Sequence, residues 1–413
     1  MMAGFLLARM GIDTLVLEKH GDFLRDFRGD TIHASTLEIM YELGILNEFL
    51  KRQHQEVREL AAQVGSETVV IADLRHLPTR CKFVGLMPQW DFLDFVKEQA
   101  SRYETFHLKM QAEVSDLLIE NGTVTGVQAK TPEGVLEVRA SLTIGADGRH
   151  SVVRRKANLK VIDIGAPMDV MWMRLSRRED DRAISAFGHA DKGKILVLIN
   201  RDKYWQCAFV IPKGEAENIK KRGLEAFRQE IAGLELFLSD RVSELGDWSK
   251  VSLLTVAVDR LQEWALPGLL CIGDAAHAMS PIGGVGINLA IQDAVATANL
   301  LGEALRRGAP SLEEVLAVQR RRAFPTNATQ QMQVALQNNA IRRVLGSQQP
   351  LQLPWLLRIL RRWPALRRIP ARLIAVGFRP EHIRTPETGS ANGRADQGRS
   401  ARLELEDGRH PGD

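Results

Sequence analysis

The segment that most restricts the fold is GDAAHAMSPIGGVGIN, residues 273–288, which follows an apolar strand and opens a helix. A carboxylate that ends a strand, here Asp274, can accept hydrogen bonds from a ribose or ribityl hydroxyl. Gly283, Gly284 and Gly286 remove side chains that would keep a flat ring away from the backbone, and the amides that start the helix can bind an anionic group. The pattern predicts a nucleotide-binding loop, although a glycine-rich corner without a ligand is also compatible with it.

A second strand end carries a turn of a similar kind. Residues 144–154 (IGADGRHSVVR) place Asp147 and Gly148 after a short apolar strand, where a turn lets the backbone approach a phosphate. Ser151 and Arg154 follow at positions suited to holding the loop or the charge. Because Asp-Gly turns are common in all proteins, this segment points to a ligand only together with its companions.

The chain opens with half of a βαβ unit. Residues 1–10 (MMAGFLLARM) predict a helix without an N-cap, and residues 14–17 (TLVL) predict a buried parallel strand that ends at Glu18. A carboxylate at that position binds a ribose hydroxyl in dinucleotide folds, but it can equally be a solvated strand end. Ser35 and Glu38 are spaced as a capping box and predict the start of the next helix.

The order of predicted elements indicates an α/β fold in which a second module interrupts a nucleotide-binding domain. Alternating strands indicate an antiparallel module, after which a parallel strand and a long helix return the chain to the first domain. Arginine-rich helical sequence follows, and the polar end of the chain predicts disorder. The predicted parts are a nucleotide-binding domain (1–160 and 260–310), an antiparallel module (161–259), a helical region (311–384) and a disordered tail (385–413).

Composition argues against several functional classes. With 45% hydrophobic and 26% charged residues the chain is an average globular protein, and it has no apolar run long enough to be an integral membrane span. The net charge of +4, with basic residues crowded near the C-terminus, argues against nucleic acid as a partner. The widely spaced Cys81, Cys207 and Cys271 argue against disulfides and a metal site, and they favour the cytoplasm.

Together, in this order and spacing, the three segments resemble the FAD-dependent aromatic hydroxylase family typified by para-hydroxybenzoate hydroxylase and phenol hydroxylase. The resemblance covers residues 1 to about 325. It implies a Rossmann-like (GR2-type) FAD-binding parallel sheet, an inserted antiparallel substrate domain and a C-terminal helical region. The cofactor-binding residues that it implies are Glu18, Arg28, Gln89, Asp147, Gly148, Asp274, Pro281, Gly283, Gly284, Gly286, Ile287 and Asn288.

The resemblance also gives each motif a role. The Asp147 turn matches a motif that contacts both FAD and NAD(P)H, and Asp274 matches the residue that binds the ribityl chain of FAD. Pro281 is implied to lie near the reactive edge of the isoalloxazine ring, with the start of the following helix at its pyrimidine end. Arg28 is implied to approach the flavin and Gln89 to touch the FAD chain. A surface salt bridge for Arg28 and a helix cap for Gln89 are the structural alternatives.

The sequence departs from the family pattern at its beginning. The GxGxxG fingerprint that should lie between a first strand and the first helix is absent. Such a loop cradles the pyrophosphate of the dinucleotide, and its strand is central to the parallel sheet. The resemblance therefore implies that one strand and a glycine turn, on the order of 15 residues, precede Met1.

The implied activity is that of an FAD-dependent NAD(P)H monooxygenase. NAD(P)H binds transiently and reduces the flavin, O2 forms a flavin C4a-hydroperoxide, and its distal oxygen hydroxylates an aromatic or polycyclic small molecule. No metal and no catalytic acid or base is implied, and we expect His277 to form a structural hydrogen bond. The substrate is expected to lie between the flavin and the antiparallel module. Its candidate wall residues, which also suit a sheet core, are Met171, Met173, Phe187, Trp205 and Phe209.

The sequence alone is compatible with other functions as well. The same fold serves flavin-dependent epoxidases, quinone-ring hydroxylases and isoprenoid reductases, and a non-catalytic remnant that no longer binds FAD would keep many of the same residues. Residues 355–372 (WLLRILRRWPALRRIPAR) mix apolar and arginine side chains. They suit either peripheral contact with an anionic membrane surface or a helical cap over the FAD domain.

Overall fold

The structure is a computed structural model that describes residues 1–24, 31–181 and 186–388. The predicted cofactor residue Arg28 lies outside these residues, as does most of the predicted tail. The described chain combines short parallel strands packed against helices with a seven-stranded mixed sheet. The α/β fold with an inserted module, predicted from the order of elements, is confirmed.

Two pairs of parallel strands form the nucleotide-binding part. β1 (Thr14–Leu17) pairs with β7 (Phe106–Lys109), and β11 (Thr143–Gly145) pairs with β20 (Leu269–Cys271). The two pairs belong to separate sheets. The predicted strand at residues 14–17 is confirmed, and β20 returns the chain to the first domain as expected.

Three helices pack on these strands and share one apolar core: α1 (Met2–Arg9), α4 (Gln89–Ala100) and α8 (Gly286–Arg307). Gly4 allows α1 to approach β1 closely, because a Cβ at this position would lie 2.5 Å from Cγ2 of Val16. The predicted long helix is therefore α8, which begins within the glycine-rich segment.

An antiparallel meander extends from one side of this part. It contains β8 (Glu113–Glu120), β9 (Thr123–Thr131) and β10 (Gly134–Arg139). The first hairpin turns at Asn121 and Gly122, whose φ angles of 51° and 77° lie in the left-handed region that these two residue types tolerate. An Asn-Gly pair is a strong sequence signal for a hairpin, so the local sequence accounts for this turn.

The inserted module is centred on a mixed sheet of order β17-β13-β16-β15-β14-β4-β5. Its strands are β4 (Glu59–Val64), β5 (Glu67–Asp73), β13 (Met168–Ser176), β14 (Ala186–Asp191), β15 (Lys194–Asn200), β16 (Tyr204–Pro212) and β17 (Ser252–Leu254). β14 pairs in parallel with β4, whereas the other ladders are antiparallel. The sheet therefore extends beyond the predicted module at 161–259, because a hairpin from the first part of the chain covers the open edge of β14.

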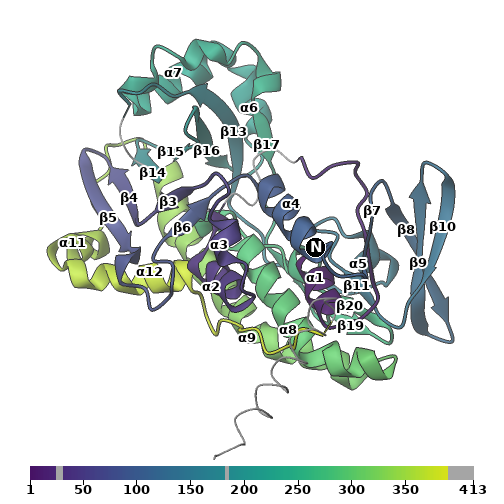
Figure 1. Cartoon of the computed structure of the whole chain (residues 1–413). Coiled ribbons are helices and arrows are strands. Elements are labelled where there is room, and N and C mark those ends of the chain that lie inside the picture. The colour runs from purple at the N-terminus through teal and green to yellow at the C-terminus, as the bar shows by residue number, and fades with distance from the viewer. Residues whose placement is uncertain (25–30, 182–185, 389–413) are drawn as a thin grey trace, which may run out of the picture.

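Helices cover one face of this sheet. α6 (Ala216–Lys221) and α7 (Leu224–Leu234) lie at the far end of the molecule, with the sheet between them and the rest of the chain (Figure 1). Phe227 and Ile231 of α7 pack with Phe209 of β16 in a single apolar core. This face of the sheet is therefore closed to solvent.

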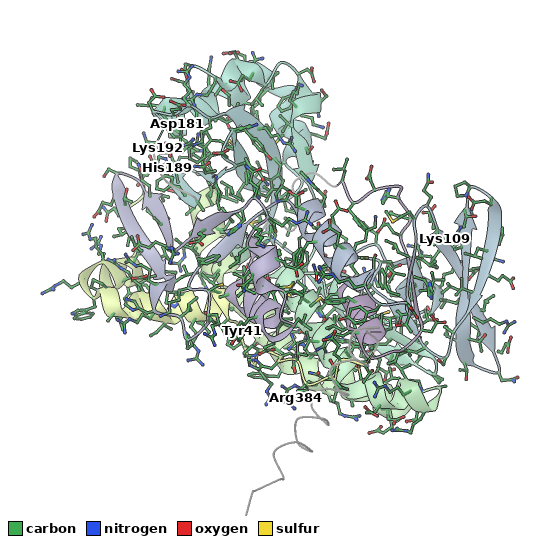
Figure 2. The ribbon with its side chains drawn as sticks, viewed as in Figure 1. Tyr41, Lys109, Asp181, His189, Lys192 and Arg384 are labelled. Carbon is green, nitrogen blue, oxygen red and sulfur yellow. The ribbon has the colours of Figure 1, made fainter. Side chains whose placement is uncertain are left out.

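A buried ion pair joins the sheet to its helical cover. Both oxygens of Asp181 accept hydrogen bonds from Arg241, at 2.6 and 2.9 Å, and the Trp205 indole donates to the same carboxylate at 2.8 Å. Burial raises the pKa of Asp181, but the hydrogen bonds from Arg241, from the Arg178 backbone and from Trp205 outweigh it and lower the pKa to about 2. Asp181 is labelled in Figure 2, in the part of the molecule that contains α6 and α7.

The C-terminal region is helical, as predicted. α9 (Leu312–Leu336) continues through a π-helix (Gln337–Ile341) into α10 (Arg342–Leu345). α11 (Trp355–Arg362) and α12 (Arg368–Ala375) then pack on β5, at the side of the molecule opposite the meander (Figure 1). None of the helices in the described ranges has both the length and the apolar character needed to cross a bilayer.

Two boundaries differ from the sequence prediction. Residues 385–388, assigned to the disordered tail, lie against α1: the Thr388 amide donates to the Arg9 carbonyl at 3.0 Å, and Tyr103 donates to Glu387 at 2.8 Å. The predicted capping box is wrong, because α2 (Ala34–Glu42) begins after His33 and Ser35 is buried within the helix.

The remaining elements are short. They are α3 (Leu46–Phe49), α5 (Val152–Lys156), β2 (Thr31–Ile32), β3 (Gln55–Val57), β6 (Val84–Leu86), β12 (Val161–Asp163), β18 (Asp259–Leu261) and β19 (Ala265–Leu266). β2, β6 and β3 form a small antiparallel sheet, and β12 pairs with β18. β19 pairs with β20 in the sheet that also contains β11.

The buried carboxylate of Asp181 gives a stability prediction. Asp181→Asn leaves the buried Arg241 with only the more exposed Asp240 as its counter-charge, and we expect the free energy of unfolding at pH 7 to fall by about 3 kcal/mol in urea denaturation. Because the folded-state pKa lies below the unfolded value, the wild-type carboxylate stabilises the fold above about pH 4 and loses this effect as the pH falls toward 2. Asp180→Asn, at an exposed neighbour, is the control; equal stability of the two variants would contradict the prediction.

Candidate active site

The two predicted acidic turns lie at the same edge of one strand pair. Gly145 of β11 is aligned with Cys271 of β20, and the Ile272 amide donates to the Gly145 carbonyl at 2.9 Å. Because the strands are parallel, both chains leave the pair at its carboxyl edge, where Asp147 and Asp274 follow. Strands that are far apart in the sequence thus bring the two turns to one edge.

Asp147 caps the helix that follows it. Its carboxylate accepts hydrogen bonds from the Ser151 hydroxyl at 2.5 Å and from the Val152 and Val153 amides at 2.7 and 3.1 Å. Gly148 has a φ of 84°, and a Cβ there would meet nothing within 4 Å. The carboxylate thus fixes the turn, while Gly148 leaves the space in front of it open.

Arg154 connects this turn to the second one. Its guanidinium donates to both carboxylate oxygens of Asp259 at 3.1 and 3.2 Å, and to the Ala275 carbonyl at 3.5 Å. Both side chains of this ion pair are 12% exposed, so solvent screens the pair weakly. The expected loop-holding role of Arg154 therefore takes the form of a tie between β18 and the Asp274 turn.

The glycine loop, residues 281–287, requires glycine at two positions because of their backbone conformation. Gly283 and Gly284 have φ angles of 77° and 61°, and a Cβ at Gly284 would lie only 2.1 Å from the Thr31 hydroxyl oxygen. At Gly286 a Cβ would lie 3.9 Å from a carboxylate oxygen of Asp274. The loop thus passes close to β2, and Gly286 keeps the space beside Asp274 free.

Asn288 fastens this loop to the start of α2. Its amide donates to the Thr31 and Gly284 carbonyls at 2.9 and 3.1 Å, and its carbonyl oxygen accepts from the His33 amide and the Thr36 hydroxyl, both at 2.8 Å. The side chain is buried. Sequence reasoning considered only the backbone of Asn288 and missed this role of its side chain.

His33 is a second residue that the sequence did not reveal. Its ring is buried, and Nε2 lies 3.0 Å from the Gly283 carbonyl oxygen. Burial lowers the pKa of His33 to about 4, against the opposing effect of hydrogen bonds to the Gly283 and Ile374 backbone. The imidazole is therefore neutral at pH 7 and braces the loop without adding charge.

A buried network of charged side chains binds the backbone of Gly273, next to Asp274. Asp293 of α8 accepts from the Gly273 amide at 3.0 Å and from Arg322 of α9 at 2.8 Å, and it lies 2.6 Å from Nε2 of His277. Burial raises the pKa of Asp293, but His277 and Arg322 outweigh it and hold the pKa low. His277 thus forms the structural hydrogen bond expected of it.

Three glutamines of α9 and the π-helix form hydrogen bonds with the segment that leads into the glycine loop. We call these three residues the glutamine ladder. Gln330 donates to the Asp259 and Ala278 carbonyls at 2.8 and 3.2 Å. Gln333 accepts from the Ser280 amide at 3.2 Å and donates to the carbonyls of Ser280 and Ile282 at 3.0 and 2.8 Å. Gln337 donates to the Ser280 hydroxyl at 2.6 Å. All three glutamines are buried, so these bonds replace water for the loop backbone.

Four more of the predicted cofactor residues lie in the described chain: one after β1, one at the start of α4 and two in the glycine loop. Glu18 follows β1, and its carboxylate accepts from the His20 amide at 3.0 Å. Gln89 is the first residue of α4, and Pro281 and Ile287 are half-buried at the two ends of the glycine loop. Arg28 lies outside the described residues, so the structure does not place it.

The candidate wall residues take the alternative position in the core of the sheet. Met171, Met173, Trp205 and Phe209 point into the core beneath α6 and α7, and Phe187 is buried as well. Side chains alternate between the two faces of a strand, so the residues between them face the other way. The opposite face belongs to a cluster that includes Ile282 of the glycine loop and Ile341 of the π-helix; its strand members include Val170, Trp172, Ile195, Val197, Ala208 and Val210.

Comparison with known sequences agrees with the motif analysis. A family profile described as "FAD binding domain" matches residues 1–332. The 6-methylpretetramide 4-monooxygenase of Streptomyces rimosus is 31% identical over 331 residues, which cover 80% of this chain and 79% of that protein. The rifampicin monooxygenase of Streptomyces venezuelae is 26% identical over 328 residues, which cover 71% of this chain and 60% of that protein.

Comparison with solved structures gives the same fold. The p-nitrophenol 4-monooxygenase PnpA from Pseudomonas putida DLL-E4 superposes with a TM-score of 0.68 at 18% identity, over 91% of this chain and 92% of that one. PqsL, a probable FAD-dependent monooxygenase from Pseudomonas aeruginosa, gives a TM-score of 0.69 at 22% identity, over 83% and 94%. With the family profile and the 31% identical relative, the chain belongs to the family of FAD-dependent aromatic hydroxylases and monooxygenases, which are oxidoreductases.

Proposed function

We propose that this enzyme uses NAD(P)H and O2 to hydroxylate an aromatic or polycyclic small molecule. The observation that carries the proposal is the meeting of the Asp147 and Asp274 turns beside the glycine loop, at the carboxyl edge of β11 and β20. The relatives are named for 6-methylpretetramide, rifampicin and p-nitrophenol. From these names we infer a ring-containing substrate.

The space beside the two acidic turns suits FAD. Gly148 and Gly286 carry no side chain next to Asp147 and Asp274, so an extended chain of hydroxyls and phosphates fits against the backbone there. The start of α8 adds amides directed at an anionic or carbonyl-rich group. When bound, FAD supplies the electron transfer and the activation of O2.

We assign the surrounding side chains to this cofactor. Asp274 would accept hydrogen bonds from the ribityl hydroxyls and Glu18 from the adenosine ribose. Neutral His33 and the Asn288 side chain would keep the loop in place under the flavin ring. The other proposed FAD contacts are Arg28, Gln89, Asp147, Gly148, Pro281, Gly283, Gly284, Gly286, Ile287 and the Asn288 backbone.

The substrate is proposed to lie on the face of the seven-stranded sheet that looks toward the glycine loop. Its wall would be formed by Trp172, Ile195 and Val197, the half-buried side chains of that face, together with Ile282 and Ile341. These side chains are almost entirely apolar, which favours a flat hydrophobic molecule and excludes water from the reaction. The chain itself would bind, orient and shield the reactants.

We also propose that the enzyme works in the cytoplasm next to a membrane. Cys81, Cys207 and Cys271 are buried free thiols, as in proteins of reducing compartments. The arginine-rich α11 and α12 carry exposed apolar side chains, which favours contact with a lipid surface.

Removing the carboxylate of Asp274 tests the cofactor assignment. We expect Asp274→Ala to raise the dissociation constant for FAD about tenfold or more, because a charge-assisted hydrogen bond is worth about 1.5–3 kcal/mol. FAD would be titrated into the apoprotein and followed by flavin fluorescence and the visible spectrum. Asp13→Ala, at the amino end of β1, is the control. Equal affinity of both variants, or wild-type protein that does not take up FAD, would refute the assignment.

The glutamine ladder gives a second test. Gln333→Leu leaves one amide and two carbonyls of the loop without partners, and we expect the free energy of unfolding to fall by about 3 kcal/mol. We also expect weaker FAD binding at temperatures where the variant is folded. Gln331→Leu, an exposed position on the same helix, is the matched control. Unfolding midpoints that agree within error would contradict the role of the ladder.

A further inference from the structure

The charge of the C-terminal region is entirely positive over a long stretch. Residues 315–380 contain no aspartate, glutamate or lysine, but they contain twelve arginines. Nine of these arginines lie after residue 341, in the segment that includes α11 and α12. A net charge of +4 for the whole chain therefore conceals a strongly cationic region at one side of the molecule.

The two short helices carry some apolar side chains that are buried in the chain and others that are exposed. On their inner side Leu360, Ala371 and Ala375 are buried; the last two pack with residues of β5 and its neighbours. Four large apolar residues of the two helices and their connection are instead exposed over more than half of their surface: Trp355 (72%), Leu356 (55%), Trp363 (56%) and Ile369 (59%). Packing within the chain accounts for the inner side only.

Arginines frame these exposed side chains. Arg361 is paired with Glu67 of β5. Arg362, Arg368 and Arg372 are exposed, and none of them forms an ion pair with any residue in the described ranges. The outer side of α11 and α12 thus combines uncompensated positive charge with tryptophan and aliphatic side chains.

We propose that this α11–α12 surface, made of Trp355, Leu356, Trp363, Ile369, Arg362, Arg368 and Arg372, docks on an anionic lipid bilayer. Tryptophan is enriched at the membrane interface, and arginine is attracted by the negative headgroups. Eight-residue helices are too short to span the bilayer, so they would lie in its surface. Nucleic acid fits less well, because Leu356 and Ile369 have no aromatic face on which a base can stack.

The position of the surface also connects it to the proposed active site, a step that rests on the proposed function. Ile374 of α12 lies on the inner side, 4.0 Å from where a Cβ of Gly283 would be, and its backbone is hydrogen-bonded to the ring of His33. One short helix therefore separates the outer surface from the glycine loop. Docking would bring the loop close to a bilayer in which a hydrophobic ring compound is dissolved.

Binding to vesicles tests the docking directly. The purified full chain would be centrifuged with vesicles of phosphatidylcholine alone and with 30% phosphatidylglycerol. We expect binding to the anionic vesicles only. The triple variant Arg362→Gln/Arg368→Gln/Arg372→Gln should lower the partition coefficient about a hundredfold, at about fivefold for each arginine. Trp355→Ser/Trp363→Ser should also weaken binding. The control Leu236→Ser/Lys221→Gln removes an exposed leucine and a lysine near α7 and should bind like the wild type.

The outcomes separate this proposal from the proposed function. Wild-type protein that stays in the supernatant with anionic vesicles, or surface variants that bind as well as the control, would overturn the docking and leave FAD binding untouched. A labelled 20-nucleotide DNA bound in the absence of vesicle binding would replace the lipid partner by nucleic acid. Vesicle binding by protein that takes up no FAD would support the docking while refuting the cofactor assignment.

Discussion

The parallel pairing of β11 with β20 is the contact on which the rest of the site depends. These strands come from opposite sides of the inserted module, and the hydrogen bond between Ile272 and Gly145 holds them in register. The Asp147 and Asp274 turns, the Arg154 tie and the glycine loop all follow from that register. A loss of this pairing would separate the two acidic turns, whatever the remaining packing of each half.

Sequence reasoning succeeded where a local pattern has few structural solutions. An apolar strand followed by an acidic glycine turn located both carboxylates, and the Asn121-Gly122 pair located a hairpin. It failed on the face of β13, where Met171, Trp172 and Met173 are apolar in succession. Without alternation between apolar and polar residues, the sequence does not tell which side chains face the core, and a shift by one residue exchanges the two faces.

Other features were hidden because their partners lie far away in the chain. The glutamines of α9 look like the polar side of an exposed helix, yet Gln330 and Gln333 bind backbone groups about 50 residues earlier. His33 has no neighbouring residue in the sequence that marks it, since its ring lies against Gly283 and Ile374 of α12. Such contacts are decided by tertiary packing, which periodicity and propensity do not record.

The π-helix at Gln337–Ile341 determines which side chains of the C-terminal region face the seven-stranded sheet. A π-helix of this kind corresponds to one extra residue in an α-helix, and one residue turns the following side chains by about 100°. Ile341, which ends the π-helix, and Leu345 of α10 pack on the sheet after this extra residue. A single-residue deletion here would redirect the side chains that follow it, so the length of this segment, as well as its composition, determines which residues pack on the sheet.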